Sequence, residues 1–267
     1  MINIENLTLI SSLTLLICSI NCSLIGNFVL WKKLSFYGDT LSHSAIFGLA
    51  LGYFFNINQI LILIIFNLIF SILINFLSRQ KIFAIDSIVM ILSYLFISFG
   101  ILFNNKFNPN IEFEEFILGN ISSITIYHLL ICVSLFLLII LFILFFTKDF
   151  LLTIINQDIA ITKKIKENKI NLFLMIIISL LIAFAVKITG ILMVTALMII
   201  PCATSRMVTK NPFQMIKFSA IISALIALFG IYFSHNFNID TIPTIIFINT
   251  ILFFTILILK RIFYEEI

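Results

Sequence analysis

Two residues with metal-ligating side chains lie four positions apart where an apolar stretch begins, in "KKLSFYGDTLSHSAIFGLALGYFF" (Lys32 to Phe55). On a helix, Asp39 and His43 would share one face with about 5–6 Å between their Cβ atoms, close enough to hold one ion. A carboxylate oxygen with an imidazole nitrogen suits zinc, manganese or ferrous iron better than calcium or magnesium. The spacing therefore makes this pair a candidate transition-metal site.

Two ligands make an incomplete site, which is what a transient carrier needs, because a closed four-ligand site would retain the ion. In a symmetric dimer, two facing pairs would supply four ligands near the axis. A structural alternative is that Asp39 caps a helix starting at Gly38-Asp39-Thr40, with His43 hydrogen-bonding within the first turn. Spacing alone does not separate the two roles, and they are not exclusive.

The composition places this pair in a membrane protein. The chain has 267 residues, of which 62% are hydrophobic and 10% charged, whereas a soluble domain has roughly a quarter charged residues. Runs of about 20 apolar residues recur along it, as in transmembrane helices. An ionisable side chain inside a span is costly unless it pairs or faces water, which favours a functional role for Asp39 and His43.

The apolar runs predict an all-α polytopic protein whose single domain, residues 1–267, crosses the membrane nine times. The predicted spans are residues 7–30, 38–55, 57–78, 84–103, 127–147, 170–187, 188–208, 213–234 and 241–260. If these spans alternate, all but Lys106 and Lys187 of the 16 Lys and Arg residues fall on one side. The positive-inside rule then places the N-terminus outside and the C-terminus in the cytoplasm. Because the basic residues lie in separated loops, the net charge of +4 predicts no nucleic-acid partner.

Three connections differ from simple links between spans. Residues 56–59 predict a tight outer turn. Residues 104–115 predict an outer loop with three glutamates, and residues 116–125, which are too short to cross, predict an interfacial or re-entrant helix. Residues 148–169 form the one sizeable cytoplasmic loop, whose mixture of isoleucine, aspartate and lysine predicts a short amphipathic helix against a partner or the membrane surface. The glutamates are Glu112, Glu114 and Glu115.

Other polar or reactive residues have weaker signals. His128 and His235 lie at predicted outer span ends, where a solvated interfacial role is favoured over a role in transport. Lys187 and Gly190 separate two apolar runs and Pro201 interrupts the second, a pattern that allows kinks in moving or cavity-lining helices. The four cysteines, Cys18, Cys22, Cys132 and Cys202, have no paired metal-ligand spacing and are predicted to be buried apolar groups.

No nucleotide-binding or protease motif is present in the sequence. It lacks the G-x-x-x-x-G-K-[ST] loop, a dinucleotide fingerprint and H-E-x-x-H. The chain is therefore not predicted to be an enzyme, and ATP-driven transport would need a separate ATPase chain.

Two long motifs resemble the membrane permease subunits of zinc/manganese ABC importers. "WKKLSFYGDTLSHSAIFGLALG" (Trp31 to Gly52) resembles the early signature of that family and is most similar to its zinc permeases. "VKITGILMVTALMIIPCATSR" (Val186 to Arg206) resembles the second signature, and the weaker matches "AIDSI", "FILGNISSIT" and "QDIAITKK" lie between them. The resemblance covers nearly the whole chain.

The resemblance implies a homodimer with the architecture of the vitamin B12 class of ABC importers, in the bacterial cytoplasmic (inner) membrane. Each subunit would dock on a cytoplasmic ATPase through the loop around Asp158 and Ala160, and an extracytoplasmic metal-binding protein would deliver the ion. The metal ligands of the family map onto Asp39 and His43. Zn²⁺, or else Mn²⁺, would be the transported substrate, with no permanently bound cofactor.

Two positions depart from the family pattern. Leu118-Gly119-Asn120 stands where the family often has Phe-Gly-Asp, and Lys164 stands where it usually has Gly, four residues after Ala160. Three rival functions stay open at this point: an ABC permease for a metal chelate such as a siderophore or cobalamin, an ATP-independent secondary transporter or channel, and a membrane scaffold that transports nothing.

Overall fold

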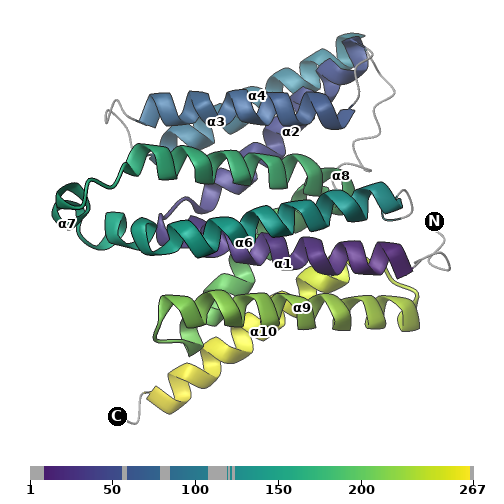
Figure 1. Cartoon of the computed structure of the whole chain (residues 1–267). Helices are drawn as coiled ribbons and strands as arrows, with labels where there is room; N and C mark the ends of the chain where they lie inside the picture. Colours follow the sequence, from purple (N-terminus) through teal and green to yellow (C-terminus); the bar gives the residue numbers. More distant parts are fainter. Residues whose placement is uncertain are drawn as a thin grey trace. The chain divides into compact units, whose positions relative to one another are not determined.

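The computed structural model describes residues 9–55, 59–78, 85–107, 119, 121 and 124–264. Over these residues the regular structure is entirely helical, as Figure 1 shows, so the predicted all-α class is confirmed. The helices are α1 (Leu9–Trp31), α2 (Ser35–Phe55), α3 (Gln59–Ser78), α4 (Ile85–Phe107), α6 (Ile126–Ile155), α7 (Gln157–Thr162), α8 (Glu167–Val208), α9 (Pro212–Phe237) and α10 (Thr241–Tyr264).

Six of the described helices are long and apolar enough to cross a membrane. They lie in α1, α4, α6, the first part of α8, α9 and α10, and two shorter apolar helices cover Leu61–Leu77 and Met193–Val208. Each of the nine predicted spans falls on helical structure, although α2 is not among those six. The sequence therefore located the helices correctly, and the number of crossings stays a prediction.

Several helices extend beyond the predicted spans. Helix α2 begins at Ser35, three residues before the predicted start, and α6 continues to Ile155, eight residues beyond the predicted end, so the first third of the predicted loop 148–169 is helix. Apolar runs mark the part of a helix that meets lipid, whereas backbone hydrogen bonding continues into polar residues beyond it. Residues 56–58 of the turn predicted at 56–59, the three glutamates of the predicted outer loop and most of residues 116–125 lie outside the described residues.

The predicted interruption at residues 187–190 is confirmed by a break in α8 at Gly190. Helix α8 has 42 residues, which as a straight helix would be roughly 63 Å long, twice the roughly 30 Å hydrocarbon thickness. Gly190 interrupts it with non-helical dihedrals, φ 77° and ψ 166°, in a region that favours glycine. Pro201 lies inside the second part of α8, where the backbone dihedrals are helical.

A second glycine lies against this break. Gly119 also has a positive φ of 75°, and a Cβ placed on it would lie 2.5 Å from the carbonyl oxygen of Ile188 and 2.6 Å from the nitrogen of Gly190. Only glycine therefore fits at position 119 without moving the backbone at the break in α8.

The chain divides into two compact units. The first comprises Met1–Leu30, Glu114–Ser134 and Ala185–Ile267, and therefore contains most of α1, the second part of α8, α9 and α10. Polar side chains join its helices: the Asn27 amide donates to Ser219 Oγ at 2.7 Å, and the Ser223 hydroxyl donates to the Ser19 carbonyl at 2.8 Å. Helices α9 and α10 pack side by side, with Gly230 against Ile245 (Figure 1).

The second unit comprises Trp31–Phe113 and Leu135–Phe184. It contains α2, α3 and α4, most of α6, α7 and the first part of α8. Helix α2 packs against both α3 and α4 (Figure 1), and phenylalanine rings fill the space: the Phe47 and Phe66 centroids are 5.4 Å apart, and those of Phe66 and Phe96 are 5.3 Å apart. This aromatic cluster fixes α2, the helix that contains the candidate metal pair.

The packing of α1 against α8 gives a testable prediction. A Cβ on Gly26 would lie 1.8 Å from the Met198 carbonyl oxygen, so Gly26→Ala must push two helices apart. Overpacking of this kind costs about 1–3 kcal/mol, and we expect a lower melting temperature for the purified variant. Gly48→Ala is the matched control, because its new Cβ meets Phe66 atoms at 3.4 Å. Equal melting temperatures for the two variants would contradict the close α1–α8 packing.

Candidate functional site

Asp39 and His43 face each other on α2, as their spacing predicted. Asp39 Oδ2 lies 3.7 Å from His43 Nδ1, and the side chains of His43 and Asp39 are 29% and 43% exposed. Asp39 lies within α2, which begins four residues earlier at Ser35, so the alternative prediction that it caps the helix is wrong. The pair is therefore free to act on something outside the helix.

Helix α4 fixes the position of the His43 ring. The Thr40 hydroxyl donates to the Val89 carbonyl at 3.2 Å, and His43 Nδ1 lies 3.2 Å from Ser93 Oγ. One to two turns further on, Gly100 lets α4 approach the backbone of Phe47 closely. The residue numbers of the contacting positions increase in the same direction along both helices, so α2 and α4 run parallel. This register places Ser93 opposite His43.

Ser93 was not among the predicted site residues. Its only signal is position: Val89, Ser93, Phe96 and Gly100 are spaced four, three and four residues apart, the period of one helix face. A serine in an apolar run is too common to predict a site, and the partner of this face becomes clear only from the α2–α4 packing.

Within the part of the chain that the structure describes, the pair does not belong to a larger cluster of metal-binding side chains. Among the described residues, no three His, Cys, Asp or Glu side chains are arranged to hold a metal ion. All four cysteines are buried and unpaired by disulfides, as predicted. Asp39 and His43 therefore offer one carboxylate and one imidazole, which leaves about half of the positions of a four-coordinate ion for other ligands.

Helix α7 is the short helix predicted within residues 148–169, and both of its ends are capped. The Asn156 side chain accepts hydrogen bonds from the backbone of Asp158 at 3.0 Å and of Ile159 at 3.1 Å. At the other end, the nitrogens of Ile165 and Lys164 donate to the carbonyls of Ala160 and Ile161, both at 2.9 Å. This bond pattern is a Schellman motif, which usually needs a left-handed residue after the cap.

Lys164 is that left-handed residue. Its φ is 55°, so the turn keeps the conformation that a glycine would favour, although the sequence has lysine where the resembled family usually has glycine. The turn after α7 is therefore present despite the substitution, at the conformational cost that a side chain has in this region.

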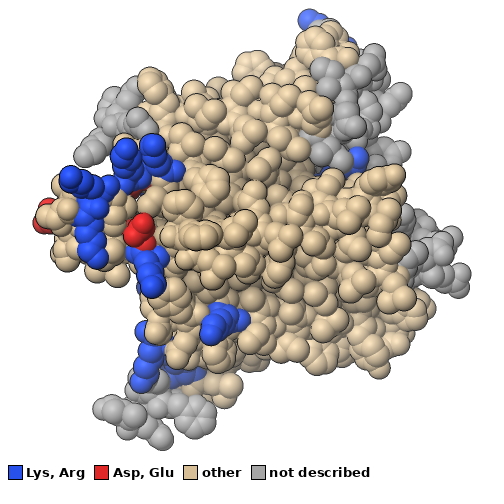
Figure 2. All heavy atoms as spheres, viewed as in Figure 1, with Lys and Arg blue, Asp and Glu red and all other residues tan. Residues whose placement is uncertain are grey.

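The outward face of α7 is a mixture of acidic and apolar side chains. Asp158, Ile159 and Ile161 are exposed, whereas Ala160 is buried and supports the helix from within. Figure 2 shows lysines gathered around α7, where Lys163, Lys164, Lys166 and Lys169 are all exposed. An exposed apolar face bordered by charges is typical of a docking surface.

Lys32, which follows α1, has a lowered pKa. Burial disfavours its ammonium form and lowers the pKa, while the nearby Glu167 carboxylate acts in the opposite direction. Both residues belong to the second unit. This attraction links the α1–α2 connection to the start of α8 electrostatically.

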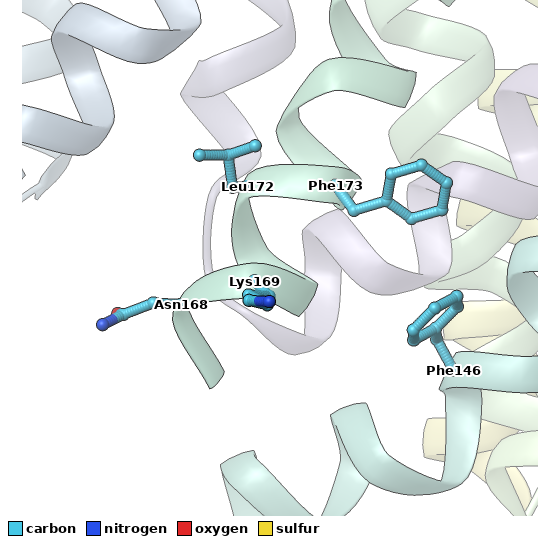
Figure 3. Close-up of a pocket in the computed structure, with 5 residues that line it drawn as sticks. All are labelled: Phe146, Asn168, Lys169, Leu172 and Phe173. Carbon is cyan, nitrogen blue, oxygen red and sulfur yellow. The ribbon is translucent and has the colours of Figure 1, made fainter. Parts of the chain in front are cut away.

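A groove of about 490 Å³ lies between α6 and the start of α8 (Figure 3). It is lined by Phe146, Asn168, Lys169, Leu172 and Phe173, and the Phe146 and Phe173 ring centroids are 5.5 Å apart. Its polar side chains are the Asn168 amide and the Lys169 ammonium, so the lining has no carboxylate, imidazole or thiolate for a transition-metal ion. It shares no residue with the Asp39–His43 pair.

The structure also describes three other predicted positions, His128, His235 and Lys187. The Thr125 backbone N–H donates to His128 Nδ1 at 3.1 Å, and because Thr125 directly precedes α6, His128 acts as the third-residue partner of a capping box. His235 is exposed in the last turn of α9. Lys187 is partly exposed, three residues before the Gly190 break. The solvated interpretation of His235 agrees with this exposure.

The sequence matches the ABC 3 transport family over residues 5–260. The chain belongs to this family. A high-affinity zinc uptake system membrane protein, ZnuB, from Buchnera aphidicola subsp. Baizongia pistaciae is 35% identical, over 86% of this chain and 88% of the relative. A manganese transport system membrane protein, MntC, from Listeria innocua is 26% identical, over 92% of this chain and 87% of the relative.

A solved structure has the same fold as this ABC 3 family member. PsaBC from Streptococcus pneumoniae, solved in complex with Fab, aligns with a TM-score of 0.81 at 22% identity, over 94% of this chain and 91% of that chain. The predicted likeness to a family of ABC importer permeases is thus confirmed by sequence, and the helical fold by structure.

The left-handed lysine of this ABC 3 family member gives a second prediction. Lys164→Gly removes the side chain from a backbone with φ 55°, and we expect it to stabilise the turn by about 1 kcal/mol. Slower hydrogen exchange of the Lys164 and Ile165 amides would report this gain. Lys163→Gly is the control, because Lys163 has a φ of −79° and glycine there should loosen the same turn. Faster exchange in Lys164→Gly would contradict the Schellman assignment.

Proposed function

We propose that this chain is the membrane permease subunit of an ATP-driven ABC importer for a divalent transition-metal ion, with zinc favoured over manganese. The observation on which the proposal depends is the Asp39–His43 pair, 3.7 Å apart on an apolar helix of a transport-family protein. The zinc uptake relative is more similar to this chain than the manganese relative, at 35% against 26% identity. This difference favours zinc, and membership of an ABC family favours ATP-driven uptake over a secondary transporter.

The proposed topology has nine spans in a single permease domain of the bacterial cytoplasmic (inner) membrane. The break at Gly190 supports it, since it divides α8 into a first segment long enough to cross and a second, shorter apolar segment. The basic residues of the connections support an outer N-terminus and a cytoplasmic C-terminus. Apolar side chains exposed on α6 and α10, such as Leu144 and Phe247, are suited to contact with lipid.

The proposed site holds the ion briefly rather than storing it. With α2 beginning at Ser35, His43 lies roughly 12 Å along the helix, less than half of the apolar thickness. Two ligands from one chain are too few for tight binding, and a homodimer would bring a second Asp39–His43 pair to the same ion. The importer would therefore need two copies of this chain, with the metal as substrate rather than as a resident cofactor.

The partner on the cytoplasmic side is proposed to be a separate ATPase subunit that docks on α7. Asp158 and the exposed isoleucines of α7 supply the contact, while Ala160, which is buried, keeps α7 in place. Movement of the ATPase would then be transmitted to α6 and α8, which flank α7 in the chain. An extracytoplasmic metal-binding protein is the proposed partner on the other side, delivering the ion.

Lys187, Gly190 and Pro201 are proposed to allow α8 to move. The non-helical Gly190 already interrupts the hydrogen-bond ladder, and Pro201 lacks the N–H that would complete it further along. Helices with such defects are common where transporters change conformation. Lys187, partly exposed near the break, would change its surroundings if the two parts of α8 moved against each other.

Loss of either proposed ligand gives the third prediction. Asp39→Ala and His43→Ala should each lower zinc uptake by at least about tenfold, since even outer-shell partners of metal ligands contribute factors of 10–100. Uptake of radioactive zinc is measured in cells with equal amounts of permease in the membrane. His235→Ala, an exposed histidine at the end of α9, is the matched control and should retain normal uptake.

Three results would bear on this proposal. Near-normal uptake by well-expressed His43→Ala protein would refute the ligand assignment. If cells that lack the permease lose uptake of a metal chelate but keep uptake of free zinc, the chain would be a chelate importer. Zinc uptake that persists without any ATPase subunit would exclude the ABC mechanism.

The α7 contact gives the fourth prediction. Ile161 is 71% exposed, so Ile161→Ser should leave the permease folded while removing apolar surface that the ATPase would bury. A fully buried isoleucine contributes about 1.5–3 kcal/mol, which corresponds to at least about tenfold weaker association. Titration of the purified permease with the ATPase measures this. Thr162→Ser, which can keep the hydrogen bond of its hydroxyl to the Ile159 carbonyl, is the control, and equal affinities for both variants would exclude α7 as the contact.

A further inference from the structure

We infer that Ser93 on α4 is a positioning residue of the proposed metal site, which orients the His43 ring so that Nε2 meets the ion. This inference rests on the proposed function. Ser93 Oγ lies 3.2 Å from His43 Nδ1, and Asp39 Oδ2 lies 3.7 Å from the same nitrogen. Ser93 Oγ is therefore the nearer of two oxygens, from two helices, that lie close to this nitrogen.

The chemistry of the ring explains why this arrangement matters. A neutral imidazole has one N–H donor and one nitrogen lone pair, and the hydrogen bond of the first decides which nitrogen binds metal. Among the described residues, the polar contacts of the His43 ring both use Nδ1. A proton on Nδ1, donated to Ser93 Oγ, leaves the Nε2 lone pair for the ion.

Ser93 differs from the other hydroxyls of its surroundings. In membrane helices, serine and threonine commonly donate to a carbonyl of their own helix one turn back, as Ser98 does to Tyr94 and Ser42 does to Gly38. The Ser93 hydroxyl contacts a side chain on another helix instead. With only 7% of its surface exposed, it meets little competition from water for this contact.

The α2–α4 register keeps Ser93 and His43 together. The Thr40–Val89 hydrogen bond lies one turn before the contact and the close approach at Gly100 lies beyond it. The Phe47 and Phe96 rings, 5.8 Å apart, pack between them. Because contacts on both sides fix the register, the Ser93 hydroxyl is held beside His43 Nδ1 before the ion arrives.

The test compares Ser93→Ala with Ser93→Thr, Ser98→Ala and His43→Ala in the complete importer. Outer-shell partners of metal-bound histidines contribute factors of 10–100 in affinity or activity, so Ser93→Ala should lower zinc uptake about tenfold. Co²⁺ alone is the binding probe, and its visible absorption on the purified permease–ATPase complex should show about tenfold weaker binding. Ser93→Thr keeps the hydroxyl and should recover most of the zinc uptake and most of the Co²⁺ affinity. Ser98→Ala should behave as wild type.

The outcomes separate this inference from the proposed function. If His43→Ala abolishes uptake while Ser93→Ala transports normally, the metal site stands and the role of Ser93 is refuted. If His43→Ala itself transports normally, the proposed site falls and this inference falls with it. If Ser93→Ala lowers uptake but binds Co²⁺ with unchanged affinity and an unchanged spectrum, the hydroxyl serves only packing and the inference is overturned.

Discussion

The absence of water from the bilayer core is the constraint that governs this structure. A polar group inside the hydrocarbon must find its partner within the protein, because lipid offers none. The first unit meets this requirement in part with bonds between helices, such as Asn27 to Ser219 and Cys202 to the Ser23 carbonyl at 3.0 Å. The Asn249 side chain is an exception, since its buried amide atoms have no partner among the described residues. Asp39 and His43 differ from this pattern, because they contact each other and yet remain partly exposed.

This contrast is the strongest structural argument for function. A carboxylate and an imidazole that served only the fold would be expected to be buried and fully hydrogen-bonded, as the Tyr37 hydroxyl is with Ser71 at 2.5 Å in the same unit. The pair instead leaves surface accessible on an apolar helix, where a charged group is costly. An open polar pair is retained in such a place when something polar has to bind there and leave again.

Much of the fold could be predicted because hydropathy is a strong signal in a membrane protein. The helices, the break at Gly190 and the shared face of Asp39 and His43 follow from apolar runs, glycine and the helical period. The start of α2 was misplaced because a helix begins where its hydrogen bonds begin, and Ser35 lies ahead of the apolar run. The end of α6 was misplaced for the same reason, since its last turns contain Lys148 and Asp149.

Ser93 and Lys164 show what the sequence does not contain. Ser93 became informative only when the register of α2 against α4 placed it beside His43, and this register depends on contacts distributed over several turns. Lys164 departs from the pattern of the resembled family, yet two backbone hydrogen bonds keep the left-handed turn. In both cases the role of a single residue depends on tertiary structure, which a local sequence pattern does not contain.

The incompleteness of the site is consistent with its proposed task. A third or fourth ligand in the same chain would raise affinity, but an ion bound that tightly would leave slowly, and a permease must release its cargo in every cycle. In the proposed dimer, dividing the ligands between two copies would let a change in their separation alter the affinity without any change of side chain. The orientation of the His43 imidazole then becomes more important, because the described part of the chain has no further ligand beside the pair to compensate for a misoriented ring. A fixed hydroxyl at Nδ1 meets this need while adding no ligand to the ion.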